Sequence, residues 1–118
     1  MSPNAAIHVI DDDAAVRDSL SLLLECHGIP AHTYVSGSAV LDNVGIGPDD
    51  HLLIDVIMPD LNGPELLARL RARGVSAPAV FMTGAISPQL QQIAARTGAI
   101  VLEKPFSADE LFAALDAR

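Results

Sequence analysis

The chain has 118 residues, a length that allows one ordinary domain with a single core. Half of its residues are hydrophobic, yet it has no run of about 18 apolar residues, so we expect a soluble protein without a membrane span. Fifteen acidic residues against seven Lys and Arg give a net charge of −8, which argues against direct binding to nucleic acid.

The N-terminus, the cysteine and the histidines indicate where the protein is located and which sites it lacks. No basic segment precedes the first apolar stretch, which argues against a secretory signal and favours a cytoplasmic location. The single cysteine, Cys26, cannot form an internal disulfide, and its place in an apolar helical pattern predicts a buried, inert thiol. The histidines have no metal-ligand spacing, which disfavours a zinc site; they are His8, His27, His32 and His51.

The first half of the chain predicts a strand, a helix, a second strand and a short helix. Residues 5–10 form a strand that ends in acid, and Asp13 can cap the helix that follows, which Gly28 ends. The apolar face of this helix consists of Val16, Leu20, Leu23 and Leu24, and its outer face carries Arg17, Asp18 and Glu25. Residues 31–35 form the second strand, and a short helix covers about 36–44.

The second half is organised around a short apolar run that ends in a carboxylate. Residues 52–55 are too few for a helix and fit a strand that is buried on both faces of a parallel sheet, with Asp55 at its end. The remaining expected elements are a helix from Pro64 to Gly74, a strand at 78–82, a helix from Ser87 to Thr97, a strand at 100–103, and a last helix that begins with the capping box of Ser107 and Glu110.

Five strands that alternate with five helices predict a doubly wound α/β fold. Parallel neighbours require crossover connections, and these are right-handed, so helices cover both faces of the sheet. We expect residues 1–118 to form one domain without an internal repeat or linker.

Polar residues follow the expected strands at the points where they end. Asp11 and Asp12 follow the first strand, Asp55 ends the third, Thr83 follows the fourth and Lys104 the fifth. A lone aspartate at a strand end is more often a turn cap than a functional group. The joint placement of all these side chains at the carboxyl edge, where open α/β sheets bind ligands, is less readily explained in that way.

This set of side chains suits one kind of chemistry. Three carboxylates in one crevice raise each other's proton affinity, and a hard divalent cation such as Mg²⁺ relieves the repulsion. A lysine ammonium and a threonine hydroxyl opposite the metal would bind a tetrahedral oxyanion. Together these groups indicate phosphoryl transfer to a carboxylate.

The motifs resemble those of the receiver domain of bacterial two-component response regulators, the CheY-like superfamily. The matching stretches are Ile10-Asp11-Asp12-Asp13, Ile54-Asp55-Val56-Ile57-Met58-Pro59, Asn62-Gly63, Thr83-Gly84 and Glu103-Lys104-Pro105-Phe106. They occur in the family's order over essentially the whole chain, and the last two are most like receivers of the FixJ type, which often precede a DNA-binding domain. The resemblance implies a flavodoxin-like sheet with strand order 2-1-3-4-5 and a signalling domain that is not an enzyme.

The resemblance also implies roles for individual residues. Asp55 would accept a phosphoryl group from a phosphohistidine on a sensor histidine kinase. Mg²⁺ would be bound by Asp12, Asp55 and the backbone carbonyl of Ile57, with Asp11 acting mostly through a water. On the same basis Lys104 would contact the phosphoryl group.

Two further family features concern the last strands. Thr83 would move toward the phosphoryl group once it is attached, and the Lys104-Pro105 peptide bond is expected to be cis. The residue three before the lysine is usually aromatic in the family, but here it is Val101, and the stretch from Gly98 to Lys104 is about one residue short. We therefore expect weakened relay from Thr83 to the output face.

Two positions that tune dephosphorylation in the family are Ile57 and Ala85 in this chain. Neither side chain can hold or polarise a water, so the resemblance predicts a comparatively long-lived aspartyl phosphate. Packing alone is also a sufficient reason for Ile57.

Two other functions stay open at this point. A haloacid-dehalogenase-type phosphate hydrolase would use Asp11 as the nucleophile with Asp13 as the second acid, although the chain is short for that class and has no cap insertion. A phosphorylation-independent adaptor is also conceivable because of Val101.

The expected partners follow from the resemblance. They are a sensor histidine kinase and either a downstream protein or an effector domain beyond Arg118, and the family often pairs through its output face, so a homodimer is possible. The arginines at 69, 71 and 73 favour a solvated helix face over an anion site.

Overall fold

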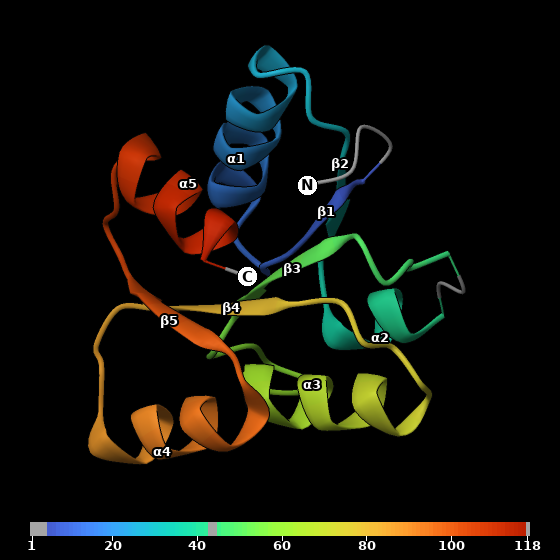
Figure 1. Cartoon of the computed structure of the whole chain (residues 1–118), viewed down its shortest axis with the longest axis vertical. Coiled ribbons are helices and arrows are strands. Elements are labelled where there is room, and N and C mark those ends of the chain that lie inside the picture. The colour runs from blue at the N-terminus through green and yellow to red at the C-terminus, as the bar shows by residue number, and fades with distance from the viewer. Residues whose placement is uncertain (1–4, 43–44, 118) are drawn as a thin grey trace.

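Five parallel strands form the centre of the protein in the order β2-β1-β3-β4-β5 (Figure 1). The computed structural model describes residues 5–42 and 45–117. The strands are β1 (Ile7–Ile10), β2 (Ala31–Tyr34), β3 (His51–Asp55), β4 (Ala79–Thr83) and β5 (Ile100–Glu103). Every neighbouring pair is parallel, which confirms the expected doubly wound sheet and its strand order.

Helices cover both faces of this sheet. They are α1 (Ala14–Cys26), α2 (Gly37–Leu41), α3 (Gly63–Ala72), α4 (Pro88–Thr97) and α5 (Ala108–Asp116). Figure 1 shows α1 and α5 on one face and α2, α3 and α4 on the other. This arrangement follows from right-handed crossover connections between parallel strands.

Each helix begins at a residue whose side-chain oxygen accepts a hydrogen bond from a free backbone N–H of the first turn, and this stabilises the helix end. The capping residues are Asp13, Ser36, Asn62, Ser87 and Ser107. The expected capping box of Ser107 and Glu110 is present in α5, and Asn62 forms another with Glu65 in α3.

The core has two halves, one on each face of the sheet. Ile10, Ile54 and Phe81 point from β1, β3 and β4 toward α3 and α4. Ile7, Val9, Leu53 and Met82 point from the same strands toward α1 and α5. Because side chains alternate along a strand and both faces are covered, β3 and β4 are buried at every residue, as expected for central strands of a parallel sheet.

Several expectations about single residues and element boundaries differ from the structure. Cys26 is exposed rather than buried, because it lies two residues beyond the buried Leu24 and therefore about 200° around the helix. The first strand begins at Ile7 rather than at residue 5, and β4 begins after Pro78, which has no N–H for the ladder. The expected end of the short helix, Val44, lies outside the described residues, within which α2 ends at Leu41.

None of the helices in the described part of the chain has the length and apolar character that crossing a bilayer requires.

Candidate functional site

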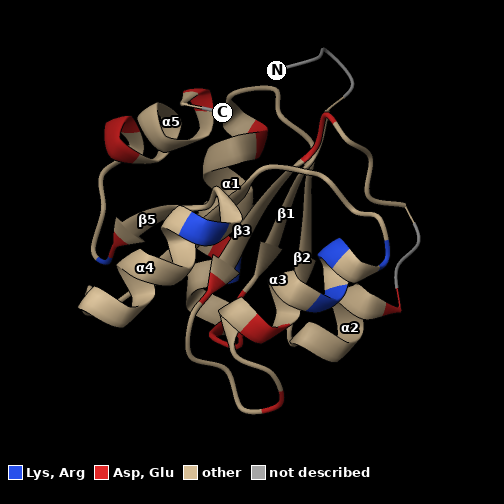
Figure 2. Ribbon diagram, turned by 60° about the horizontal axis from the view of Figure 1, so that its bottom comes forward, with Lys and Arg blue, Asp and Glu red and all other residues tan. Residues whose placement is uncertain are grey.

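The strand register brings the predicted site residues to one edge of the sheet. Ile10 pairs with Ile54, so the next residues on the two central strands, Asp11 and Asp55, are neighbours where the strands end. On the other side of β3, Thr83 pairs with Glu103, which places Lys104 one residue beyond the strand tips. Figure 2 shows acidic segments at the ends of strands and on the loops beyond them.

Three carboxylates meet at this edge. Oxygen atoms of Asp11, Asp12 and Asp55 lie within 4.8 Å of one another. Asp11 is buried and Asp55 nearly so, at 1% and 8% exposure, whereas Asp12 is exposed to solvent. Carboxylates in a partly buried group of this kind are the ligands that Mg²⁺ prefers, and the donor set therefore fits such an ion.

Lys104 joins two of these acids. Its Nζ donates to Asp11 Oδ2 at 2.9 Å and to Asp55 Oδ1 at 3.2 Å. The expected cis peptide bond is present between Lys104 and Pro105, and the backbone N–H of Lys104 donates to the carbonyl of Thr83 at 2.7 Å. One ammonium group thus bridges two of the three carboxylates.

The excess of negative charge changes the proton affinities of the site. Burial raises the pKa of Asp55, and the charges of Asp11 and Asp12 raise it further, against the opposing effect of Lys104. Burial alone would lower the pKa of Lys104, but its hydrogen bond to Asp11 and the charges of Asp55 and Asp11 outweigh burial, so its pKa is raised. A cation that joined the site would relieve the repulsion among the acids.

Two backbone features hold the acids in place. Asp11 Oδ1 accepts a hydrogen bond from the N–H of Asp13 at 2.9 Å, and its carbonyl accepts one from the guanidinium of Arg17 at 2.8 Å. Gly63 packs directly behind Asp55: a Cβ at this position would lie 2.9 Å from the Asp55 carbonyl oxygen, a distance that real Cβ atoms do not adopt. Only glycine fits there without a shift of the Asp55 backbone.

Sequence comparison identifies the family. The sequence model of the response regulator receiver domain matches residues 7–116. This chain belongs to the response regulator receiver family. It is 41% identical over 119 residues to the transcriptional regulatory protein FixJ of Azorhizobium caulinodans, in an alignment that covers 99% of this chain and 56% of that protein. The receiver thus spans about half the length of the curated relatives it matches.

Solved structures of receivers have the same fold. The chemotaxis protein CheY4 of Vibrio cholerae superposes with a TM-score of 0.87 at 27% identity, over 96% of this chain and 97% of CheY4. The structure titled FixJ-N gives a TM-score of 0.86 at 29% identity, over 98% of this chain and 93% of that one.

Family membership sets the general chemistry. Response regulators receive signals from sensor kinases, and phosphorylation on aspartate with a dependence on Mg²⁺ is typical of their receivers. Receivers generally bind Mg²⁺ at an acidic pocket, and this receiver has an aspartate cluster of that kind. The family does not favour the phosphate hydrolase considered from the sequence.

The structure joins some of the predicted residues and not others. Asp11, Asp12, Asp55 and Lys104 form one cluster. Thr83 is buried in the adjacent strand, but its hydroxyl donates to the carbonyl of Ala85 at 2.9 Å rather than to a group of this cluster.

Three details of the receiver site escape the sequence pattern. Ile57 is 79% exposed to solvent, so packing within the described part of the chain does not account for this residue. Arg17, placed on the outer face of α1 by its helical period, is half-buried and reaches back to Asp11. The close approach of Gly63 to Asp55 is not evident from the pattern either, although a glycine between the helix cap Asn62 and Pro64 is a hint of it.

Proposed function

We propose that Asp55 accepts a phosphoryl group from the phosphohistidine of a sensor histidine kinase, and that this receiver acts as a switch rather than an enzyme with an external substrate. The observation that supports this proposal is the cluster of three carboxylates, two of which are bridged by Lys104. Asp55 is the member of the cluster that ends the central strand and retains one carboxylate oxygen without a hydrogen bond from any described residue.

In the proposed reaction an oxygen of Asp55 forms a bond to phosphorus while the bond from phosphorus to the kinase imidazole breaks. The imidazole takes the bonding electron pair as it leaves. Asp11, Asp12 and Asp55, with the backbone carbonyl of Ile57, would hold Mg²⁺, which supplies positive charge to the phosphoryl oxygens when bound. Lys104, which already contacts Asp55, supplies a second positive charge next to the acceptor.

The proposed switch involves Thr83. In the structure its hydroxyl both donates to the carbonyl of Ala85 and accepts from the Ala85 N–H, at 2.9 and 3.2 Å. A phosphoryl group on Asp55 offers a stronger, charged acceptor on the neighbouring strand. We expect Thr83 to exchange its bond to Ala85 for one to the phosphoryl group, which moves the loop that joins β4 to α4.

The output of the switch passes to a downstream protein or to an effector domain outside this chain. Val101, in β5, packs half-buried against the core formed with α3 and α4. It has fewer atoms than an aromatic residue to transmit a movement of Thr83, so we propose a weakened relay to the face formed by α4, β5 and α5. If the relay were lost altogether, the protein would act as an adaptor that does not depend on phosphorylation.

Incubation with a small-molecule phosphodonor tests the function. Wild-type protein is expected to incorporate phosphate in the presence of Mg²⁺ and not in the presence of a chelator, and Asp55→Asn is expected to incorporate none. Asp18→Asn is a matched control because it removes the charge of an exposed aspartate of α1 that lies outside the cluster. Labelling that survives in Asp55→Asn, or sustained turnover of a phosphate ester, would overturn the proposal.

A further inference from the structure

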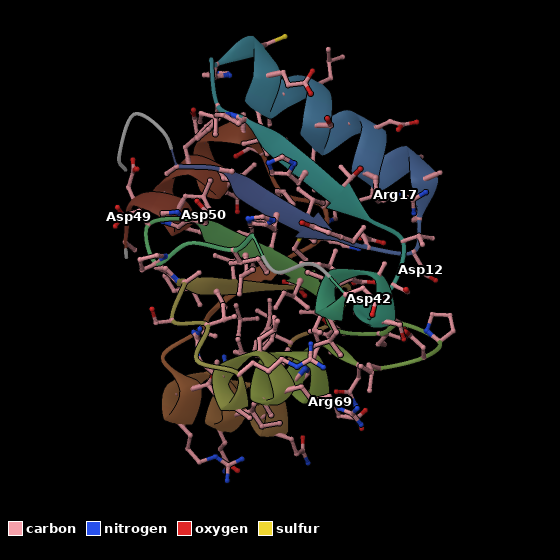
Figure 3. The ribbon with its side chains drawn as sticks, turned by 90° about the vertical axis from the view of Figure 1, so that its right-hand side faces the viewer. Asp12, Arg17, Asp42, Asp49, Asp50 and Arg69 are labelled. Carbon is pink, nitrogen blue, oxygen red and sulfur yellow. The ribbon has the colours of Figure 1, made fainter. Side chains whose placement is uncertain are left out.

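Arg17 makes a contact that a surface arginine on a helix does not usually make. Its side chain turns back from the first turns of α1, and its Nη1 donates to the carbonyl oxygen of Asp11 at 2.8 Å. Its backbone N–H makes an ordinary helical hydrogen bond to the carbonyl of the capping residue Asp13, at 3.1 Å. The guanidinium is therefore the group by which Arg17 holds the loop between β1 and α1, and it does so at Asp11. Figure 3 shows Arg17 and Asp12 together where α1 begins.

The peptide group that Arg17 holds is the one that links Asp11 to Asp12. The other bonds of Asp11 are already directed: its N–H donates to the carbonyl of Tyr34 at 3.2 Å, and its two carboxylate oxygens accept from Asp13 and Lys104. With its carbonyl bound to Arg17, every polar group of Asp11 has a hydrogen-bond partner. These bonds fix the direction in which the loop continues from β1.

Asp12 depends on that direction. No other described residue makes a hydrogen bond to the Asp12 carboxylate, and this side chain is exposed, so only the backbone of the loop sets where it points. A tilt of the peptide group between Asp11 and Asp12 would carry the Asp12 carboxylate away from Asp11 and Asp55.

We propose that Arg17 is a positioning residue for the cation site: by holding the Asp11 carbonyl it keeps the Asp12 carboxylate within reach of Asp11 and Asp55. This inference rests on the proposed function, since it assumes that the acids bind Mg²⁺. It assigns to Arg17 no contact with the metal or the phosphoryl group.

Charge and geometry make opposite predictions for this residue. If Arg17 acted only through its positive charge, its removal would strengthen the binding of Mg²⁺, because like charges repel. If Arg17 positions Asp12, its removal weakens binding; loss of a group that orients metal ligands typically weakens affinity about 10- to 100-fold. The sign of the change separates the two roles.

The test is calorimetric titration of Mg²⁺ into the folded wild type, Arg17→Met and Arg17→Lys. Arg17→Met keeps most of the apolar stem and removes the donor, so its Kd for Mg²⁺ is expected to rise roughly 10-fold. Arg17→Lys retains the charge and one donor group, and its Kd is expected to lie between the two. Arg96→Met, which removes an exposed arginine of α4 without a hydrogen bond to any described residue, is the control for net charge.

A second readout separates positioning from a purely structural role. In the phosphodonor reaction, Arg17→Met is expected to require a higher Mg²⁺ concentration for half-maximal rate and to approach the wild-type rate at saturation. Lower stability without a change in either Mg²⁺ constant would overturn the proposal, and so would unchanged or tighter binding.

Two outcomes of the titration have separate meanings. If folded wild-type protein binds no Mg²⁺, the proposed function fails; if wild type binds it and Arg17→Met binds it equally well, only the role of Arg17 fails. Should Arg17→Met not fold, Arg17→Lys is compared with wild type, and an unchanged Kd contradicts the proposal.

Discussion

Asp50 directly precedes β3 and Asp55 ends it, and the surroundings of the two side chains act on a carboxylate in opposite ways. Asp50 accepts hydrogen bonds from the N–H groups of Ala6 and Gly47, each at 3.0 Å, and from His8 Nε2 at 2.8 Å. Although burial alone would raise the pKa of Asp50, these hydrogen bonds outweigh it and lower the pKa. At Asp55, burial and the neighbouring acids prevail and raise the pKa.

The difference shows how an aspartate with a full set of hydrogen-bond donors differs from the proposed phosphoacceptor at the other end of β3. The site of Asp50 is complete: His8 Nδ1 continues the network to the hydroxyl of Tyr34 at 2.8 Å, so one cluster joins β1, β2 and the start of β3. At the site of Asp55, one ammonium group is hydrogen-bonded to two of three carboxylates, so negative charge remains in excess. Figure 3 shows Asp50 at the opposite end of the strands from Asp12.

The largest expected contrast is between Asp50→Asn and Asp55→Asn. Asp50→Asn replaces a carboxylate oxygen that accepts hydrogen bonds with an amide group that donates, so we expect its free energy of unfolding to fall by about 3 kcal/mol. Asp55→Asn relieves repulsion with Asp11 and should be at least as stable as wild type. Chemical denaturation of the three proteins measures both effects. If Asp50→Asn is as stable as wild type, the hydrogen bonds of Asp50 do not set it apart from Asp55.

An intermediate effect is expected at Ile57, whose exposed side chain stands two residues beyond Asp55. Ile57→Asn places an amide where it can orient a water, and we expect the phosphorylated protein to lose phosphate about 10-fold faster, below the range that general acid–base catalysis usually contributes. The decay of the phosphorylated fraction after removal of the phosphodonor gives the rate. The matched control is Val35→Asn, which changes another exposed apolar residue. Rapid loss from wild type, or an equal gain in the control, would contradict a role for Ile57.

A smaller effect concerns pH. Because the pKa of Asp50 is below 3.8 in the folded state, its contribution to stability is present above that pH and is lost as pH falls through the lowered pKa. Because the pKa of Asp55 is raised above 3.8, the folded state holds its proton more tightly, and stability falls as pH rises through this window.

Unfolding experiments from acid to neutral pH without Mg²⁺ measure how each of the two carboxylates changes stability with pH. The stability advantage of Asp55→Asn over wild type should grow as pH rises above about 4, whereas the disadvantage of Asp50→Asn should shrink as pH falls below it. Comparison with each variant cancels other titrating groups, such as His51, whose pKa is lowered by burial. Parallel profiles for the two variants would show that the two carboxylates have equivalent surroundings.

The smallest expected effect is in the output face. Amide shifts with and without beryllofluoride, which mimics the phosphoryl group, should be large around Asp55 and Thr83 and reduced across α4, β5 and α5. Val101→Tyr should increase the changes on that face if the short side chain limits the relay. Full-sized changes in wild type would reject weak coupling.

The fold was predictable because its signals are local and repeated. The apolar runs of β3 and β4, the caps at Asp13 and Ser107, and the alternation of strand and helix all lead to one topology. The start of the first strand is harder to place, because the N–H of Ala6 donates to the Asp50 side chain rather than to a neighbouring strand. Cys26 follows an apolar helical pattern and is predicted to be buried, but its position two residues beyond Leu24 places it on the exposed side of α1.

The sequence predicts which strand-end side chains gather at the site, but not the contacts that hold them in place. Asp11, Asp55 and Lys104 are strand-end residues whose neighbourhood follows from a parallel sheet. The contacts of Arg17 and of Asp50 depend on how a side chain turns back onto a loop, and a helical or strand period carries no information about that. Several of these contacts end on backbone atoms, which every residue has, so residue type does not predict them.

The most direct test of the account is to locate the phosphoryl group. After reaction with a phosphodonor and Mg²⁺, the aspartyl phosphate can be reduced chemically and the modified residue identified by mass spectrometry of peptides. The account predicts modification at Asp55 alone, and none when Mg²⁺ is chelated. Modification at Asp11 or Asp50, or labelling that does not depend on the cation, would contradict it.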